Sequence, residues 1–315
     1  MTQHQVCILG GSGFVGRHLA ARLNELKINC KVLTRRRESR RELLVLPYCE
    51  LIEADIYRLD VLRSHFQSST AVINLVGILN ETGHDGHGFR KAHVELSRLV
   101  LQAAQQTSVR QILHMSALHA DAAKGRSFYL RTKGEAEDYL HTFHGTVKLT
   151  SFCPSVIFGP GDGFFNRFAE LLRMSPVVFP LPCANSKFAP VYVGDVVDQF
   201  IQALTDCHYN QTRVNLCGPE IYTLKQLVEF TADTIGLRRK VIALPNFIAK
   251  TQALLMEYFV PTRPFTLDNY YSLQTDSTCP DGRPMPTGIR AIVPSYLGKQ
   301  DQRGQYRYYR ENARR

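Results

Sequence analysis

Residues 5–20, QVCILGGSGFVGRHLA, determine the fold class that we predict for this chain. The apolar run 5–9 is typical of a short buried strand. Apolar residues then recur at helical spacing, at Val15, Leu19, Leu23 and Leu26. Between the strand and the helix, Gly10, Gly13 and Gly16 form a GxxGxxG turn. A strand, a glycine-rich turn and a helix in direct succession are typical of a dinucleotide-binding βαβ unit.

The glycine turn itself predicts a site for a pyrophosphate group. One glycine permits the tight turn, one lets the backbone approach the phosphates, and one lets the helix pack closely on the strand. The N–H groups at the start of the helix and the positive end of its dipole then face the anion. We therefore expect the nucleotide to contact Gly10, Ser12, Gly13, Phe14, Val15 and Gly16.

The first half of the chain alternates short apolar strands with amphipathic helices. Helices are expected around 90–106 and 127–141, and strands at 30–34, 49–55, 71–79, 110–116 and 148–159. This alternation predicts an α/β, Rossmann-type, doubly wound parallel sheet. Beyond residue 160, proline, aromatic and turn residues become frequent, which indicates a smaller C-terminal substrate-side lobe.

The predicted domain organisation has three parts. Residues 1–155 form the dinucleotide-binding Rossmann domain, and 156–275 form the smaller lobe, with strands that return to the main domain. Residues 276–315 form a tail rich in Pro, Gly and Arg, for which disorder is the default expectation.

Composition restricts the partners that fit this chain. Lys and Arg number 38 against 28 Asp and Glu, a net charge of +10, which suits a phosphorylated ligand, an acidic protein or an anionic membrane surface. No motif supports nucleic-acid binding. No apolar stretch reaches the length of a membrane span, which leaves peripheral association with a membrane open.

The eight cysteines are scattered, and none forms a CxxC pair. Several lie in apolar runs, as in SFCPSVIFG, so we expect buried, reduced thiols, a reducing compartment and no zinc site. The sequence has no secretory signal, which leaves two expected locations. One is the bacterial cytoplasm, including peripheral association with the inner membrane. The other is the mitochondrial matrix, for a protein whose presequence was removed.

The residues that follow the second strand, Thr34-Arg35-Arg36-Arg37, favour NADP(H) over NAD(H). A site for NAD(H) usually has Asp or Glu at this position, which binds the ribose hydroxyls. Here no carboxylate stands at the strand end to repel a 2′-phosphate. The guanidinium groups of Arg35 and Arg36 match phosphate geometry in a bidentate manner.

Tyr129 and Lys133 are four residues apart on one predicted helix, so their side chains share a face. Ser116 follows the preceding strand, where open α/β sheets bind ligands. These residues form a candidate catalytic set for carbonyl reduction or alcohol oxidation. Tyr129 is the general acid or base, Lys133 stabilises the tyrosinate and binds the nicotinamide ribose, and Ser116 orients the carbonyl oxygen.

Further nucleotide contacts follow from fold analogy. Asp55 and Ile56, after the third strand, are placed to flank the adenine ring. The end of the fourth strand is expected to line the nicotinamide ribose, and the end of the sixth completes the site. The residues concerned are Leu75, Val76, Gly77, Pro154 and Val156, with Tyr129 and Lys133.

The chain resembles an extended or atypical short-chain dehydrogenase/reductase. It is also similar to the nucleotide-binding accessory subunit of respiratory complex I and its bacterial epimerase/dehydratase-like relatives. The residues that carry this resemblance span positions 5 to about 300, and they are GGSGFVGRHL, VLTRR, ILHMSALHAD, SFYLRTKGEAE, PSVIFGPGDGFFNRFA, PVYVGDVV and GIRAIVPSYLG. The resemblance implies bound NADPH and a role in or beside respiratory-chain or quinone biochemistry.

Two departures from the pattern of extended members concern catalysis. These proteins usually carry paired Ser/Thr residues at the end of the fifth strand, whereas His114-Met115-Ser116 leaves one hydroxyl. The asparagine common in the fourth helix is replaced by His93 or Val94, which weakens a proton relay through that helix.

Three other features have simpler interpretations. His84, Asp85 and His87 are interpreted as a mobile loop rather than a metal site. Phe164, Phe165 and Arg167 form either the roof of a pocket or a packed loop. The apolar helix 244–260 is interpreted mainly as core, with a membrane, a subunit or a quinone tail as alternative partners.

Two functions therefore stay open. The first is an NADP(H)-dependent oxidoreductase that acts on a carbonyl, alcohol or quinone-related small molecule. The second is a non-catalytic accessory subunit, in which bound NADPH stiffens a docking surface for a respiratory or quinone-biosynthesis complex.

Overall fold

The computed structural model describes residues 5–37, 41–206, 209–259, 265–279 and 284–298. The chain divides into two compact units. The first comprises Met1–Pro154 and Gly194–Leu216, and the second comprises Ser155–Val193 and Cys217–Arg315. The last part of the predicted basic tail, 299–315, lies outside the described residues.

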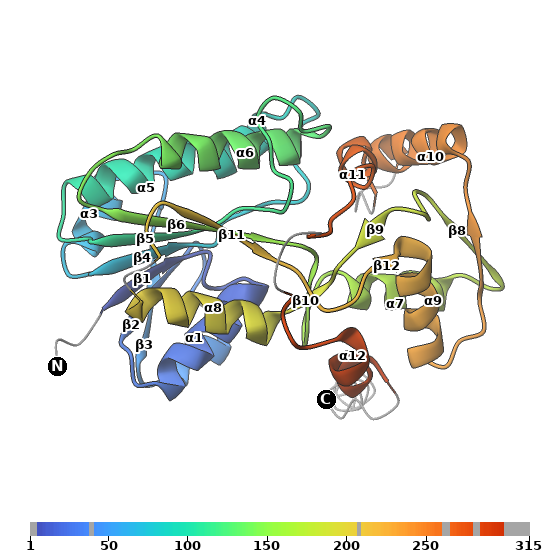
Figure 1. The fold of residues 1–315 in the computed structure, drawn as a ribbon, viewed down its shortest axis with the longest axis horizontal. Coiled ribbons are helices and arrows are strands. Elements are labelled where there is room, and N and C mark those ends of the chain that lie inside the picture. The colour runs from blue at the N-terminus through green and yellow to red at the C-terminus, as the bar shows by residue number, and fades with distance from the viewer. Residues whose placement is uncertain (1–4, 38–40, 207–208, 260–264, 280–283, 299–315) are drawn as a thin grey trace, which may run out of the picture. The chain divides into compact units, whose positions relative to one another are not determined.

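The first unit is built on a seven-stranded sheet in which every neighbouring pair is parallel (Figure 1). The strand order is β11-β6-β5-β4-β1-β2-β3. The strands are β1 Val6–Leu9, β2 Cys30–Thr34, β3 Cys49–Glu53, β4 Ala71–Asn74, β5 Gln111–Met115, β6 Lys148–Pro154 and β11 Thr212–Leu216. The order reverses between β1 and β4, and that switch point is where such sheets bind ligands. The predicted doubly wound parallel sheet is confirmed.

Helices cover both faces of this sheet. In Figure 1, α3 (Leu59–Phe66), α5 (Leu96–Gln105) and α6 (Phe128–His141) lie on one face, and α1 (Phe14–Glu25) and α8 (Val193–Thr205) on the other. Short helices α2 (Arg41–Leu44) and α4 (His87–Arg90) and a π-helix η2 (Lys91–Glu95) complete the unit. The core between the sheet and α3, α5 and α6 includes Leu9, Phe66, Val72, Val100 and Ile112, each fully buried.

Two element boundaries differ from the sequence prediction. The apolar run 71–79 stays in the sheet only to Asn74, because the Asn74 Oδ1 accepts a hydrogen bond from Val76 N and turns the chain. The helix expected around 90–106 begins earlier, at His87, and contains the π-helical turn η2 before α5. Apolar periodicity indicates neither boundary, since it records which face is buried and not where the hydrogen-bond pattern of the backbone changes.

The second unit contains small sheets and helices around its own core. Its strand pairs are β7 (Ile157–Phe158) with β10 (Val191–Tyr192), β8 (Val178–Leu181) with β13 (Lys240–Ala243), and β9 (Lys187–Phe188) with β12 (Tyr222–Thr223). Its helices are α7 Phe165–Met174, α9 Leu224–Thr234, α10 Asn246–Phe259, α11 Leu267–Ser272 and α12 Ile289–Leu297. Phe158, Phe165, Leu172, Leu227 and Val293 are fully buried in its core. Phe165 is therefore a core residue.

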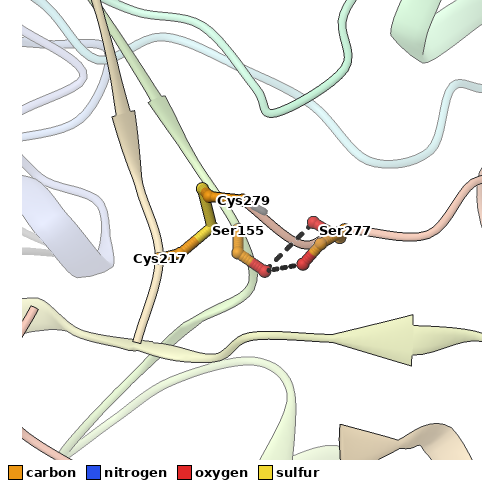
Figure 2. The surroundings of a disulfide bond; sticks show 4 residues. All are labelled: Ser155, Cys217, Ser277 and Cys279. Carbon is orange, nitrogen blue, oxygen red and sulfur yellow. Dashed lines mark hydrogen bonds between the residues drawn. A yellow bond between two sulfur atoms is a disulfide. The ribbon is translucent and has the colours of Figure 1, made fainter. Parts of the chain in front are cut away.

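A disulfide joins Cys217 and Cys279, whose Cα atoms lie 6.0 Å apart (Figure 2). The expectation that all the cysteines are reduced is wrong for this pair. The returning segment around Ser277 bonds to Lys187 O and Ala189 N, and the Ser155 hydroxyl donates to Ser277 O. These contacts bring together two cysteines 62 residues apart, so no local spacing could predict the pair. Of the other described cysteines, Cys7, Cys30, Cys49, Cys153 and Cys183 are free.

No helix in the described part of the chain is both long and apolar enough to cross a membrane.

Candidate functional site

The glycine turn between β1 and α1 has a geometry that only glycine adopts without strain. Gly10 has a φ of +75°, and a Cβ at this position would lie 2.9 Å from the carbonyl carbon of Leu75. The N–H of Gly13 donates to Gly10 O at 3.0 Å, which closes the turn. The turn therefore packs directly against the backbone that follows β4, at the switch point of the sheet.

Gly11 and Gly16 form a second close approach. A Cβ on Gly16 would lie 2.4 Å from the Cα of Gly11, and a Cβ on Gly11 would lie 2.8 Å from Val32. These contacts let α1 pack tightly on β1 and β2. Gly11 lies inside the glycine cluster but was not among the residues predicted for the site.

The start of α1 is available to an anion. No side chain in the described part of the chain caps this helix, and its first turn holds no acidic residue. Its N–H groups and the helix dipole thus face the turn that holds Gly10, Ser12 and Gly13. The Ser12 hydroxyl accepts a hydrogen bond from Thr34 Oγ1 at 3.5 Å, so the turn also contacts the end of β2. A glycine cradle and an uncapped helix start fit a dinucleotide diphosphate.

A patch of exposed arginines, Arg35, Arg36 and Arg37, follows β2. Arg36 N donates to Thr34 Oγ1 at 3.4 Å, and Arg37 N donates to Glu53 Oε2 at 3.0 Å. The backbone is therefore tied to β2 and β3 while the guanidinium groups extend outward. Glu53, at the end of β3, places a carboxylate beside this patch.

The loops after β3 and β4 hold the other predicted nucleotide contacts. Asp55 is exposed and its Oδ1 accepts from Tyr57 N at 3.0 Å, whereas the Ile56 side chain packs into the core. Leu75 and Val76 are partly buried, and Gly77 is exposed. Asp55 thus faces solvent beside the sheet, and Ile56 contributes mainly to packing.

Lys133 lies at the centre of the site. Its side chain is 2% exposed, and its Nζ donates to Met115 O at 2.8 Å and to Val76 O at 3.3 Å. A Cβ on Gly77 would lie 3.2 Å from this amine, so the glycine leaves room for it. Burial lowers the pKa of Lys133 to about 8, despite the opposing effect of Cys153 and Glu137. The helix α6 thereby fixes an amine between the ends of β4 and β5.

Tyr129 and Ser116 are placed by the elements predicted for them. Tyr129 lies one turn before Lys133 on α6 and is partly exposed. Ser116 follows β5, and its N–H donates to Phe152 O at 2.8 Å. The Ser116 hydroxyl is buried and has no hydrogen-bond partner among the residues that the structure describes. A buried hydroxyl without a partner is costly, so a bound carbonyl oxygen is a fitting acceptor for it.

His93, in the π-helical turn η2, contacts α6 through a hydrogen bond to Thr132. Its Nε2 accepts the N–H of Ile78 at 3.3 Å, so the ring proton is on Nδ1, which donates to Thr132 Oγ1 at 2.8 Å. Burial, with the Lys133 charge next, lowers the pKa of His93 to about 2. The ring centroid lies 5.6 Å from that of Tyr129, edge to face. A neutral histidine therefore packs between α6 and the loop after β4, beside Tyr129.

A second buried histidine, His114, lies on β5. Asn74 Nδ2 donates to its Nδ1 at 3.4 Å, while Asn74 Oδ1 accepts from Val76 N. Burial and the nearby Lys133 and His141 hold the pKa of His114 well below its usual range. Asn74 belongs to the strand end that was predicted to line the nicotinamide ribose, whereas His114 was not predicted as a site residue, because its role depends on a contact between neighbouring strands.

The last two predicted contacts fall in different units. Pro154 ends β6 in the first unit, where its O accepts from Leu118 N at 3.0 Å. Val156 belongs to the second unit, where its O accepts from Val191 N at 2.9 Å.

The chain is similar to a known protein family and to individual proteins. The model of the NAD dependent epimerase/dehydratase family matches residues 6–217. The chain is 26% identical to NADH dehydrogenase [ubiquinone] 1 alpha subcomplex subunit 9, mitochondrial, from Arabidopsis thaliana, over 87% of this chain and 70% of that protein. A mouse protein of the same description is 29% identical but is matched over only 59% of its length.

A bacterial relative is matched nearly end to end. The chain is 25% identical to a ceramide reductase from Caulobacter vibrioides, over 94% of this chain and 91% of that protein. Among solved structures, MoeE5 in complex with UDP-glucuronic acid and NAD has a TM-score of 0.72 at 18% identity, over 96% of this chain and 99% of MoeE5. At that identity the similarity shows the fold alone.

Proposed function

Because the chain belongs to the NAD dependent epimerase/dehydratase family, we propose that it is an NADP(H)-dependent oxidoreductase. The reaction interconverts a carbonyl and an alcohol on a lipid-like or quinone-related small molecule. The observation that carries this proposal is the placement of Lys133, buried between the ends of β4 and β5, one turn after Tyr129 on α6.

The residues of the site divide the chemistry among them. The nicotinamide, when bound, supplies or accepts the hydride at the carbonyl carbon. Tyr129 transfers the proton to or from the carbonyl oxygen, so that hydride and proton together convert the carbonyl into the alcohol. Ser116 holds that oxygen by a hydrogen bond. Lys133 stabilises the tyrosinate and binds the ribose. Burial lowers the pKa of this amine to about 8, which is nearer to neutral pH than that of an exposed lysine.

The arginine patch supports NADP(H) as the cofactor. Arg35 and Arg36 follow the strand that ends beside the adenosine ribose in this fold, and both side chains are exposed. A 2′-phosphate there gains charge-assisted, bidentate hydrogen bonds. The nearby Glu53 carboxylate accepts the Arg37 N–H through its Oε2.

The match to the ceramide reductase supports a lipid-like substrate. It spans nearly the whole of both chains, including the residues of the second unit. The respiratory subunits, by contrast, are matched over 59% to 70% of their length. A relative that is matched over nearly its whole length, and whose name describes the reduction of a ceramide, is therefore the better guide to the reaction.

The test is turnover by the purified full chain. NADPH consumption is followed with a panel that contains a long-chain 3-keto lipid, a short-tailed quinone and a sugar nucleotide. Oxidation of NADPH by the wild type with one substrate class, and its loss in Tyr129→Phe at unchanged NADPH affinity, supports the proposal. Absence of turnover with every substrate, in both directions, contradicts it.

A second candidate function rests on the similarity to the respiratory subunits, which are named as subunits of NADH dehydrogenase. In this alternative the nucleotide stabilises a docking surface and is not consumed. NADPH then raises the melting temperature by linkage, and the nucleotide-loaded protein co-purifies with a respiratory assembly. Tyr129→Phe leaves both properties unchanged, which distinguishes this function from the first.

A further inference from the structure

Helix α10 in the second unit exposes an apolar stripe. Phe247 is 73% exposed and Tyr258 61%, and Ile248, Leu254 and Leu255 are exposed as well. These positions recur at helical spacing, so they lie along one side of the helix. Ala249 and Ala253, on the other side, are fully buried. The helix therefore packs inward through alanines and presents its large apolar side chains to the outside.

The paired strands β8 and β13 continue this surface. Their register sets Val178 opposite Lys240 and Pro180 opposite Ile242, and all four side chains are exposed. The alternate residues Phe179, Leu181 and Val241 are buried. Helix α10 begins three residues after β13 ends, so the exposed residues of the sheet and of the helix follow one another along the chain. We call these exposed residues the docking face, with Met174 and Val177, 81% and 65% exposed, before β8.

Basic residues outnumber acidic ones in this part of the chain. From Leu237 to Met256 the sequence holds no Asp or Glu and four basic residues, Arg238, Arg239, Lys240 and Lys250. The helix α7 adds the exposed Arg173 just before Met174. The next acidic residue, Glu257, accepts a hydrogen bond from Leu267 N at 2.8 Å. A partner that covers the docking face must therefore be anionic as well as apolar.

Charge complementarity selects among the possible occupants. A second copy would bring the same cations face to face. The C-terminal segment 299–315 carries six basic residues against Asp301 and Glu311, so it is also repelled. Large apolar side chains bordered by Lys and Arg on the outside of a helix are typical of segments that lie in a lipid interface.

We propose that the docking face binds the surface of an anionic lipid bilayer, with α10 in the plane of the interface. Phe247, Leu255 and Tyr258 enter the boundary between headgroups and acyl chains. Lys240 and Lys250 contact the lipid phosphates, where each cation contributes to binding that salt screens. This surface shares no residue with the predicted nucleotide site, and binding requires neither the cofactor nor turnover.

Vesicle flotation with the full chain tests the proposal. The wild type should float with vesicles of phosphatidylcholine and phosphatidylglycerol, but not with phosphatidylcholine alone, and added salt should release it. The double variant Phe247→Ser/Leu255→Ser should weaken partitioning about tenfold or more, and Lys240→Glu/Lys250→Glu should do the same. Each variant should retain the wild-type circular dichroism and NADPH affinity, which shows that it is folded.

Matched controls lie on the first unit. Val45→Ser removes an apolar side chain that is 78% exposed, and Lys124→Glu reverses an exposed charge, so both should bind vesicles as the wild type does. The proposal is overturned if the wild type does not float, if it binds neutral vesicles equally, or if the docking-face variants bind unchanged. It is also overturned if sedimentation velocity shows a wild-type dimer that Phe247→Ser/Leu255→Ser dissociates while vesicles bind neither protein.

Discussion

Lys133 Nζ lies 2.8 Å from the carbonyl oxygen of Met115, so an amine from α6 is bonded to the last residue of β5. The next residue is Ser116, and the amine also reaches Val76 O beyond β4. This contact fixes α6, and with it Tyr129, against the strand ends where the nucleotide is expected. Its cost is the burial of a cation, which is why the pKa of Lys133 falls to about 8.

The depressed pKa of Lys133 predicts a stability that rises with pH. An unfolded lysine titrates near 10.4, so between about 8 and that value the unfolded chain binds more protons than the folded one. The wild type should therefore gain about 2 kcal/mol in free energy of unfolding between about pH 7 and pH 10, relative to Lys133→Met. Urea unfolding of both proteins across this range measures the difference. If the unfolding free energies of the wild type and Lys133→Met change in parallel with pH, the amine is not buried as described. Lys124→Met is the control at an exposed lysine.

Gly10 predicts a substitution that removes both stability and nucleotide binding. At a φ of +75°, a Cβ is strained and would contact the Leu75 carbonyl carbon at 2.9 Å. Gly10→Ala should lower the free energy of unfolding by about 1–3 kcal/mol and weaken nucleotide binding. Gly163→Ala is the matched control, since its Cβ would meet nothing within 4 Å, and it should change stability by less than about 0.5 kcal/mol. Equal effects of the two substitutions on unfolding would contradict this account of the turn.

The arginine patch predicts a change in cofactor preference. Arg35→Ala/Arg36→Ala should weaken NADPH binding by about 10- to 100-fold, because hydrogen bonds to a charged phosphate are lost. NADH binding should change by about threefold or less, since that ligand lacks the phosphate. Isothermal titration with both nucleotides measures this. Arg63→Ala, in the last turn of α3, is a control that leaves both affinities unchanged. A uniform loss for both nucleotides would assign the patch a merely structural role.

His93 predicts sensitivity to acid. Its pKa of about 2 means that the folded protein excludes a proton which the unfolded chain binds below about pH 6.5. The free energy of unfolding therefore decreases as the pH falls, by roughly 2 kcal/mol between about pH 6 and pH 4. His93→Gln removes this contribution, so its unfolding free energy should decline less steeply over that range. If the variant and the wild type lose stability in parallel, the histidine is already protonated or exposed in the folded state.

The sequence predicted the parts of the site that depend on local spacing. The glycine turn and the pairing of Tyr129 with Lys133 follow from neighbours along one turn or one helix. The order of strands and helices predicted which edge of the sheet in the first unit would face a ligand. The boundaries of β4 and of the helix after it were less accurate, because Asn74 ends the strand and η2 interrupts the helix.

The parts that the sequence did not predict depend on contacts between distant residues. His93 contacts Thr132 from another helix, and His114 contacts Asn74 from another strand, so neither has a local signature. Cys217 and Cys279 meet because the segment around Ser277 returns along the second unit. The exposed stripe on α10 was interpreted mainly as core, since an apolar pattern does not say which face is covered.

Calorimetric titration of the full chain with NADPH and NADH is the most direct test of the central claim, that the turn at Gly10 and the arginines after β2 together bind a phosphorylated dinucleotide. We predict that NADPH binds about tenfold more tightly than NADH or better, which corresponds to about 1.4 kcal/mol or more. Failure of both nucleotides to bind at millimolar concentration, or tighter binding of NADH, would contradict the account.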